Sequence, residues 1–263
     1  MRTVPALVVV GFAAGALAFA APSGADASGV ATSPESSGAI GARASISVHG
    51  DPPTISTPAP SVTLPSSGAR VSDSAPAFSV HLAEADAPFG GRFLDTGPLA
   101  VSSQRTADPS ATTGSASAAD VLALGGALTT LNLNSTCTSA SAGAHGATTL
   151  TKGTLALSAD ETITLPSDPA PNTTFSGTST GPGPGDTFTV VLNEQTSSPG
   201  SITVNAVHVI LHGPSAVGDI VIAGSSCPSP ADAPSTATPP ATPASPAEPV
   251  HPGAPPSPPS PRS

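Results

Sequence analysis

The sequence predicts an all-β fold, a single sandwich- or barrel-like domain of antiparallel strands. Short runs rich in Thr, Val, Ile and Leu recur from residue 76 onward, and Gly, Pro, Asn, Asp or Ser bounds each of them. Several runs alternate apolar and polar residues, which is the pattern of a strand with one buried face. The chain has 263 residues, of which 38% are hydrophobic, enough for one domain of ordinary size.

The first predicted strand of this domain is the clearest. Phe78, Val80 and Leu82 alternate with polar residues, so one face of this strand should be buried. The other predicted strands lie at residues 93–94, 99–101, 129–133, 148–150, 154–157, 161–165, 188–192, 201–211 and 219–223.

Two segments receive a more specific prediction. Residues 202–211 read ITVNAVHVIL and are largely apolar on both faces, so we expect a central strand that is covered on each side. Residues 116–124 are the one helix-like segment, and their helical pattern is weak.

The predicted β-rich domain spans residues 76–228, and segments rich in proline flank it. The composition of residues 28–75 predicts a flexible Ser/Pro/Ala-rich linker, within which residues 44–49 alternate enough to form one strand. Residues 229–263 predict an extended, disordered tail. This Pro-rich tail is either a stalk for O-glycosylation or an unmodified spacer.

Residues 1–27 have the features of a secretory signal peptide. Arg2 supplies the positive charge, and residues 7–20 form an uncharged apolar run. Ala25 and Ala27 give the small-x-small pattern of a signal cleavage site. A membrane anchor would need about 20 apolar residues, and proline, glycine and aspartate follow the run too early. We therefore expect an extracellular protein, secreted or associated with the cell wall, with no stable membrane span after cleavage.

The two cysteines, Cys137 and Cys227, are predicted to form a disulfide, because an even number of cysteines in an exported chain is typical of disulfide bonding. A metal or redox pair is the alternative. A metal site would need further ligands close in sequence, and the chain has no Cys-x-x-Cys motif. The sequence predicts no metal site and no cofactor.

Composition and charge exclude one class of partner. The formal net charge is −10 and Lys152 is the single lysine, whereas a nucleic-acid interface needs clustered Lys and Arg. Charged residues make up 9% of the chain and Trp and Tyr are absent, which is unusual for a cytosolic enzyme. We expect no nucleic-acid partner; a cell-wall or surface component remains the candidate, and the oligomeric state is open.

Three patterns resemble catalytic or metal-binding motifs, and each has a simpler interpretation. Residues 177–181, GTSTG, match the nucleophile elbow G-x-S-x-G, but prolines and glycines follow where that motif needs a helix. His208 and His212 are four residues apart, which on a strand separates them by about 13 Å, too far for one ion. The carboxylates that could pair for glycoside hydrolysis are Asp160, Glu161, Asp186 and Glu194. Acidic residues at strand ends and turns explain these positions more simply, so no catalytic residue is assigned.

The sequence Asn193-Glu194-Gln195 allows a structural and a functional interpretation. In the structural one, Asn193 bonds to local backbone at a strand end, while Glu194 and Gln195 face water before the turn at residues 199–200. In the functional one, Glu194 belongs to a ligand-binding rim. The structural interpretation is the preferred one.

Three segments in the C-terminal half carry a resemblance to a known family. VLNEQ at residues 191–195, SITVNAVHV at 201–209 and GDIVIAGS at 218–225 follow in this order, with Cys137 upstream in an Ala/Ser/Thr-rich strand. This order resembles the choice-of-anchor P proteins, which are exported proteins of high-GC Gram-positive bacteria. The resemblance implies an extracellular β-rich domain without an assigned activity, in a family whose members end in differing attachment signals. We expect this chain to be released, or to be held in the wall by its Pro-rich tail.

These observations predict a non-enzymatic β-domain, secreted or associated with the cell envelope, that acts as a structural or interaction module. The alternative is a secreted hydrolase with a cryptic Ser or carboxylate site. Convergent Asp, Glu, His or Ser side chains in one deep pocket would favour the hydrolase, and an exposed flat sheet would favour the module.

Overall fold

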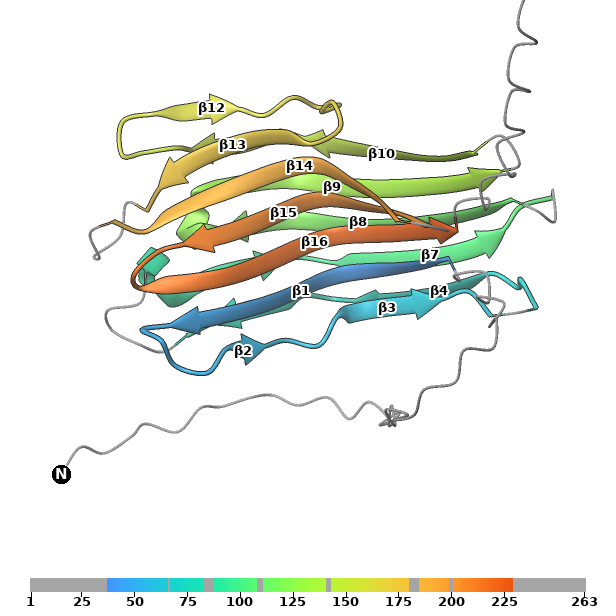
Figure 1. Ribbon diagram of the computed structural model, residues 1–263, viewed down its shortest axis with the longest axis horizontal. Helices are drawn as coiled ribbons and strands as arrows, with labels where there is room; N and C mark the ends of the chain where they lie inside the picture. Colours follow the sequence, from blue (N-terminus) through green and yellow to red (C-terminus); the bar gives the residue numbers. More distant parts are fainter. Residues whose placement is uncertain are drawn as a thin grey trace, which may run out of the picture. The chain divides into compact units, whose positions relative to one another are not determined.

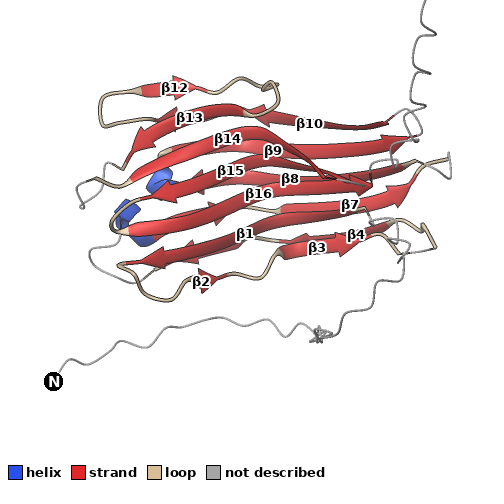
Figure 2. Cartoon of the chain, in the orientation of Figure 1, coloured by secondary structure: helices blue, strands red, loops and turns tan. Residues whose placement is uncertain are grey.

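Two antiparallel β-sheets packed face to face make up the part of the chain that the computed structural model describes (Figure 1). This part comprises residues 37–65, 67–82, 88–107, 111–140, 143–179, 185–198 and 201–228. Strands dominate it, and its helical residues lie in two 3-10 turns, η1 at Pro88–Gly91 and η2 at Leu124–Gly126 (Figure 2). The arrangement is a β-sandwich, which confirms the predicted all-β fold class.

The first and last described strands pair with each other in a seven-stranded sheet. Its strands are β1 (Gly38–Val48), β2 (Thr54–Ile55), β3 (Ala59–Thr63), β13 (Thr173–Thr178), β14 (Thr187–Ser198), β15 (Ser201–His212) and β16 (Ala216–Pro228). The hydrogen-bonded order is β13-β14-β15-β16-β1-β2, and β3 also pairs with β1. Figure 1 shows β1, in blue, beside β16, in orange-red, so this sheet joins the two ends of the domain.

The second sheet has nine strands and covers the inner face of the first. Its strands are β4 (Val71–Ala75), β5 (Phe78–His81), β6 (Arg92–Thr96), β7 (Leu99–Arg105), β8 (Thr112–Ala123), β9 (Leu128–Ala140), β10 (Gly143–Thr151), β11 (Thr154–Ala156) and β12 (Thr162–Thr164). The order is β12-β11-β9-β8-β6-β5, with β10 on β9 and β7 between β4 and β8. Every strand predicted from residue 78 onward overlaps one of the observed strands.

The prediction of a linker over residues 28–75 is wrong for its described part, which starts at Ser37. β1 pairs with β16 on one side and with β2 and β3 on the other, so it is an interior strand of its sheet. The predicted strand at residues 44–49 overlaps the C-terminal part of β1. Several inward residues of β1 are alanines, and its main partner lies at the other end of the chain; neither feature gives a local strand signal.

The helix-like interpretation of residues 116–124 is also wrong, because residues 116–123 belong to β8. The inward residues of this stretch are Ala116, Ala118, Val121 and Ala123, so the alternation of inward and outward residues slips by one between Ala118 and Val121. Asp120, inside the slip, has φ of 47°, a left-handed backbone conformation. The slip gives the buried residues an irregular spacing that departs from the period of two expected of a strand.

The alternation of inward and outward residues also slips by one across the seven-stranded sheet. This slip explains why the sequence of β15 looks apolar on both faces. In four adjacent strands two successive residues are buried and face inward: Gly41 and Ala42, Leu192 and Asn193, Ala206 and Val207, Ile222 and Ala223. We call the row of Gly41, Asn193, Ala206 and Ala223 the crease.

The prediction that both faces of β15 are covered is wrong, because its outer face is partly exposed. The residues on either side of the crease pair across the strands, but the row itself is skipped. On β15 the inward residues therefore change from even to odd numbers at the crease, whereas Thr203, Asn205, His208 and Ile210 point outward and stay partly exposed. β15 is thus central in its sheet, between β14 and β16, but only its inner face is covered by the second sheet.

The crease divides the sandwich interior into two halves of different composition. On the side of Ala42 and Val207 the buried side chains are large and apolar, and we call this side the apolar half; it contains Ile46, Phe93, Leu94, Leu124, Leu128, Leu155, Phe188, Leu192, Ile220 and Ile222. Phe89 packs edge to face on both Phe93 and Phe188, with ring centroids 5.9 and 6.2 Å apart. On the other side, which we call the disulfide half, most buried residues are small, among them Ser37, Ser103, Ser135, Cys137, Val204, Ser225 and Cys227. Ile202 is the larger exception, and it packs with Val204 and the two cysteines in a small apolar cluster.

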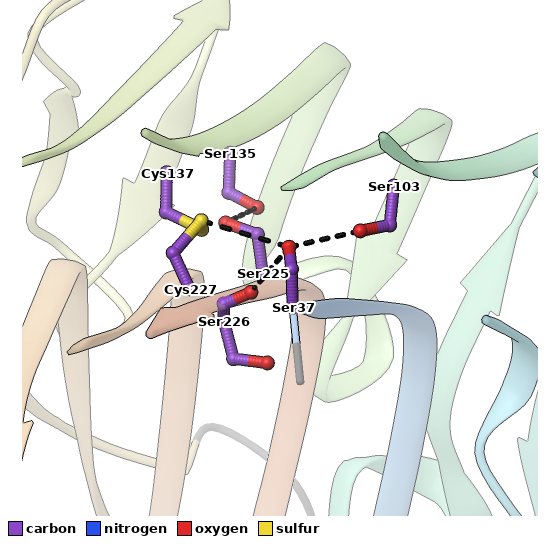
Figure 3. The surroundings of a disulfide bond; sticks show 7 residues. All are labelled: Ser37, Ser103, Ser135, Cys137, Ser225, Ser226 and Cys227. Atoms are coloured by element: carbon purple, nitrogen blue, oxygen red, sulfur yellow. Dashed lines mark hydrogen bonds between the residues drawn. A yellow bond between two sulfur atoms is a disulfide. The ribbon is translucent and has the colours of Figure 1, made fainter. Parts of the chain in front are cut away.

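The predicted disulfide between Cys137 and Cys227 is formed, and it joins the two sheets (Figure 3). Cys137 lies on β9 of the nine-stranded sheet and Cys227 on β16 of the seven-stranded sheet, with their Cα atoms 5.9 Å apart. Because packed sheets usually lie about 10 Å apart, the sheets approach each other closely here. Glycine makes this possible, since a Cβ on Gly114 would lie 2.8 Å from the carbonyl oxygen of Gly38 in the opposite sheet.

Near the disulfide, serine hydroxyl groups form hydrogen bonds with one another between the sheets (Figure 3). Ser103 Oγ donates to Ser37 Oγ at 2.8 Å, and Ser37 Oγ donates to the carbonyl oxygen of Ser226 at 3.1 Å. Ser135 Oγ donates to Ser225 Oγ at 3.2 Å. These bonds satisfy hydroxyls that are buried and would otherwise cost free energy.

Part of the prediction lies outside the described residues. The segments concerned are the predicted signal peptide at residues 1–27 with its cleavage site at Ala25 and Ala27, the first residues of the predicted linker, and the tail at residues 229–263. In the part of the chain that is described, no helix has the length and apolarity needed to cross a membrane.

Candidate functional site

Charged and polar side chains from four adjacent strands meet on the outer face of the seven-stranded sheet. Glu194 comes from β14, Asn205 and His208 from β15, Asp219 from β16, and Arg43 from β1. We call these five residues the Glu194 cluster. Hydrogen bonds and ion pairs connect its members across the four strands.

The crease brings the members of the cluster together. Glu194 pairs with Asn205 on one side of the crease, and His208 lies on the other side, opposite Val191. In regular strands the outward residues of neighbouring rows would be two positions apart, but here Glu194 and Val191 are three apart because two inward residues intervene. Asn193, between them, has φ of 50°, and such irregularities commonly re-aim a neighbouring side chain.

Glu194 accepts two hydrogen bonds, one from its own side of the crease and one from across it. Asn205 Nδ2 donates to Glu194 Oε2 at 2.7 Å, and His208 Nδ1 lies 2.9 Å from Glu194 Oε1. The other ring nitrogen of His208, Nε2, lies 4.0 Å from Asp219 Oδ2. Arg43 Nη2 is also 4.0 Å from Asp219 Oδ2. Carboxylate, imidazole, carboxylate and guanidinium thus alternate across the four strands.

Burial and charge act in opposite directions on the Glu194 carboxyl group. Burial raises its pKa, but the hydrogen bonds from His208 and Asn205 lower it, and so does the charge of His208 and Arg43. The result is a pKa below the ordinary value for glutamate. The side chains of His208 and Glu194 are 18% and 22% exposed, so the pair is partly shielded from solvent, whereas Asp219 and Arg43 are more open.

A shallow hollow of about 240 Å³ adjoins the cluster. Arg43 and Asn205 line it together with Thr203, Gly224 and Ser226, so it shares two residues with the Glu194 cluster. A second hollow, of about 420 Å³, lies on the nine-stranded sheet and is lined mainly by serines of β4, β7 and β8, with Arg70 and Asp73 at the edge strand. Both hollows are open depressions on sheet surfaces.

The chemistry available to the Glu194 cluster is hydrogen bonding and proton exchange. The polar contacts of the His208 ring are with the carboxylates of Glu194 and Asp219, and these contacts provide no hydroxyl nucleophile. In the described residues, no group of three or more His, Cys, Asp or Glu side chains is arranged to hold a metal ion.

The other catalytic patterns of the sequence are not brought together. His208 contacts Glu194, whereas His212 Nε2 lies 3.1 Å from Thr189 Oγ1. In the GTSTG pattern, Thr178 is the last residue of β13, which pairs with β14. The segment where a nucleophile elbow needs a helix begins with residues 180–184, and these lie outside the described residues.

Of the four candidate carboxylates, Asp186 is buried and distinct in its contacts from Glu194. Its Oδ1 accepts a hydrogen bond from the Ser215 backbone at 2.9 Å, and its Oδ2 is buried without a hydrogen-bond partner. Asp160 and Glu161 are exposed beside β12. Asp186 and Glu194 thus have different hydrogen-bond partners.

The structural interpretation of Asn193-Glu194-Gln195 is wrong in its details. These residues lie within β14 and not at its end. Asn193 Nδ2 donates to the carbonyl oxygen of Pro169 at 2.9 Å, and Gln195 Nε2 donates to that of Gly146, in the other sheet, also at 2.9 Å. Asn193 and Gln195 therefore hold structure together, while the partners of Glu194 come from strands that no local pattern in the sequence connects.

The chain was compared with protein-family models, with curated proteins and with solved structures. It matches none of them. The resemblance to choice-of-anchor P proteins therefore stays a prediction.

Proposed function

We propose that this chain is a secreted or cell-envelope-associated protein that acts through its surface as a structural or interaction module, without catalysing a reaction. The proposal joins the signal-like residues 1–27 and the Pro-rich residues 229–263 of the sequence to the sandwich between them.

The observation that carries the proposal is the buried disulfide between the two sheets. Cys137 and Cys227 are 0% and 1% exposed, and their bond closes a sequence separation of 90 residues. Disulfides form and persist in oxidising compartments, and they are rare in the reducing cytosol. A structural disulfide at this position supports an extracellular destination for the chain.

The Glu194 cluster supports a binding surface more than a hydrolase. It lies on an open sheet face beside a shallow hollow, whereas small-molecule enzyme sites are usually deep and enclosed. The His208 ring faces two carboxylates, so it does not activate a serine in the manner of a catalytic triad. Flat, polar sheet faces are suited to contact with an extended partner.

The proposal is tested by intact mass, measured without reduction, on protein recovered separately from the culture medium, the cell wall and the cell interior of the producing organism. We expect a mass two protons below that of the chain starting at Ser28, in the medium or the wall. A heavier, heterogeneous mass confined to the wall would also support the proposal and would show glycosylation or covalent attachment. A chain that keeps residues 1–27, remains inside the cell and has two free thiols would overturn it.

A further inference from the structure

A glycine, Gly224, lines the hollow beside the Glu194 cluster. Glu194, Asn205, Gly224 and Ile40 stand in one row across β14, β15, β16 and β1. A Cβ on Gly224 would lie 2.9 Å from Ile40 Cγ1 and 3.0 Å from Asn205 Oδ1. The hollow is therefore bounded by an apolar side chain on one side of Gly224 and by an amide oxygen on the other.

The polar groups that line this hollow include both donors and acceptors. Asn205 uses its Nδ2 to hold Glu194, which orients its Oδ1 toward Gly224 and leaves that oxygen as an acceptor. Arg43 supplies guanidinium donors, and the hydroxyls of Thr203 and Ser226 can both donate and accept. A ligand that matches this set must itself carry several groups that donate and accept.

Local charge selects against an anion. Glu194 and Asp219 place two carboxylates beside the single guanidinium of Arg43, so an anionic ligand would be repelled. A cation would have to compete with His208, Asn205 and Arg43, which already face these carboxylates. An uncharged polyhydroxyl compound avoids both costs, and its hydroxyls can bond to an amide oxygen and a guanidinium at once.

We infer that the Gly224 hollow is a binding site for an uncharged sugar ring. Its hydroxyls would bond to Asn205, Arg43 and the two lining hydroxyls, and an apolar face of the ring would lie against Ile40. The volume of about 240 Å³ is below the roughly 300–1,000 Å³ of pockets for drug-sized ligands, which fits a single ring. The inference rests on the proposed function, to which it adds the class of ligand that the surface module contacts.

The chain has no Trp or Tyr on which a sugar could stack, and the hollow is open, so we expect weak binding, with a Kd of about 1 mM or above. The experiment is a titration of the oxidised, ¹⁵N-labelled mature chain with D-glucose and with N-acetyl-D-glucosamine, followed by amide chemical shifts. D-glucuronate, the anionic counterpart of glucose, is titrated in parallel.

Two variants perturb the hollow, and a third serves as the matched control. Gly224→Ala adds a methyl group between Ile40 and Asn205, whose side chains must shift and so change the lining of the hollow. Arg43→Gln replaces the guanidinium by a shorter, neutral amide with fewer donors, and the Arg43–Asp219 contact that it breaks is solvent-exposed and contributes little to stability. Arg70→Gln removes the arginine of the hollow on the other sheet.

We expect saturable shifts at the amides of Thr203, Asn205 and Gly224 with at least one uncharged sugar, and an increase of tenfold or more in Kd for Gly224→Ala and for Arg43→Gln. Arg70→Gln should leave the Kd unchanged. The inference is overturned if neither uncharged sugar shifts these amides, if both hollow variants bind like the wild type, or if glucuronate binds more tightly than glucose.

The titration and the fractionation fail independently. A disulfide-bonded protein that is found in the medium or wall and binds neither sugar would overturn the sugar-site inference but would still support the proposed function. A reduced protein found inside the cell would overturn the proposed function whatever the titration shows.

Discussion

The two halves of the sandwich interior are held together by different means. The apolar half buries large side chains such as Phe93, Phe188 and Leu192, and its stability comes from removing apolar surface from water. The disulfide half buries serines and a small apolar cluster of Ile202, Val204 and the two cysteines, which together remove less apolar surface. Its sheets are joined instead by a covalent bond and by hydrogen bonds between hydroxyls.

The difference follows from the distance between the sheets. Large side chains need the usual separation of about 10 Å, whereas the Cα atoms of Cys137 and Cys227 are 5.9 Å apart. A Cβ on Gly146 would clash with Val204 Cγ2 of the facing sheet, so this half has no room for larger residues on β10 either. Where the sheets are too close for a large hydrophobic core, the covalent cross-link supplements a small apolar cluster.

The largest expected effect comes from removing the disulfide. The double variant Cys137→Ser/Cys227→Ser should lose about 4–5 kcal/mol of unfolding free energy in the chain-entropy model, because the bond closes a 90-residue separation. Chemical denaturation of the variant and of the oxidised wild type measures the difference. Reduction of the wild type should lower its midpoint toward that of the variant. An unchanged midpoint under oxidising conditions would show that the disulfide half is stable without its cross-link.

The next effect tests the apolar half. Phe188→Ala removes a ring that is 1% exposed and packs on Phe89, and we expect a loss of about 3–5 kcal/mol in unfolding free energy. Val204→Ala, a buried residue of the disulfide half, should cost about 2 kcal/mol, because it removes two methyl groups instead of a ring. Equal losses in the two variants would contradict the contrast between the halves.

A smaller loss of stability is expected from overpacking, where a methyl group is added between the closely spaced sheets. Gly114→Ala adds a methyl group 2.8 Å from the Gly38 carbonyl oxygen and 3.2 Å from that of Ser226, and backbone atoms cannot move aside easily. We expect a loss of about 1–3 kcal/mol. Thr113→Ala, at the preceding position of β8 and facing outward, is the control and should change stability by about 0.5 kcal/mol or less. If Gly114→Ala is as stable as this control, the sheets are not in tight contact there.

Much of the fold could be predicted from local patterns, and the parts that could not depend on distant pairing. Alternation at Phe78 and Val80 reports a strand with one buried face, and β5 is found there. The N-terminal part of β1 could not be predicted, because Ala39 and Ala42 contribute little hydrophobic signal and because its main partner, β16, lies at the other end of the chain. The disulfide needed no geometry, since Cys137 and Cys227 were the only possible pair.

The candidate site was out of reach for a different reason. Glu194 and His208 meet only because the alternation slips at the crease, and a sequence reader who assumes a strict period of two assigns the wrong face on one side of it. The positive φ of Asn193 is the physical cause, and asparagine is among the residues that adopt it most readily. An asparagine inside an otherwise apolar strand, next to a glutamate, was the available signal.

The smallest expected effect concerns the crease, where the two halves meet, and it depends on pH. The pKa of Glu194 is lower in the folded chain than its ordinary value of about 4.5, so the unfolded chain takes up this proton first as the pH falls. The stability that Glu194 contributes is therefore fully present above about pH 4.5 and is lost as the pH falls through the lower, folded-state pKa.

Glu194→Gln cannot titrate at this position, so its stability should fall less than that of the wild type between about pH 5 and about pH 3. Asp95, whose pKa is also lowered, loses its contribution in the same range, but it does so in both proteins and cancels in the difference. Asn205→Ala removes one of the two donors to Glu194 and should move the loss to higher pH. Urea unfolding across this range measures all three proteins. A wild-type minus Glu194→Gln difference that stays constant with pH would mean that the hydrogen bonds from Asn205 and His208 do not favour the ionised carboxylate of Glu194.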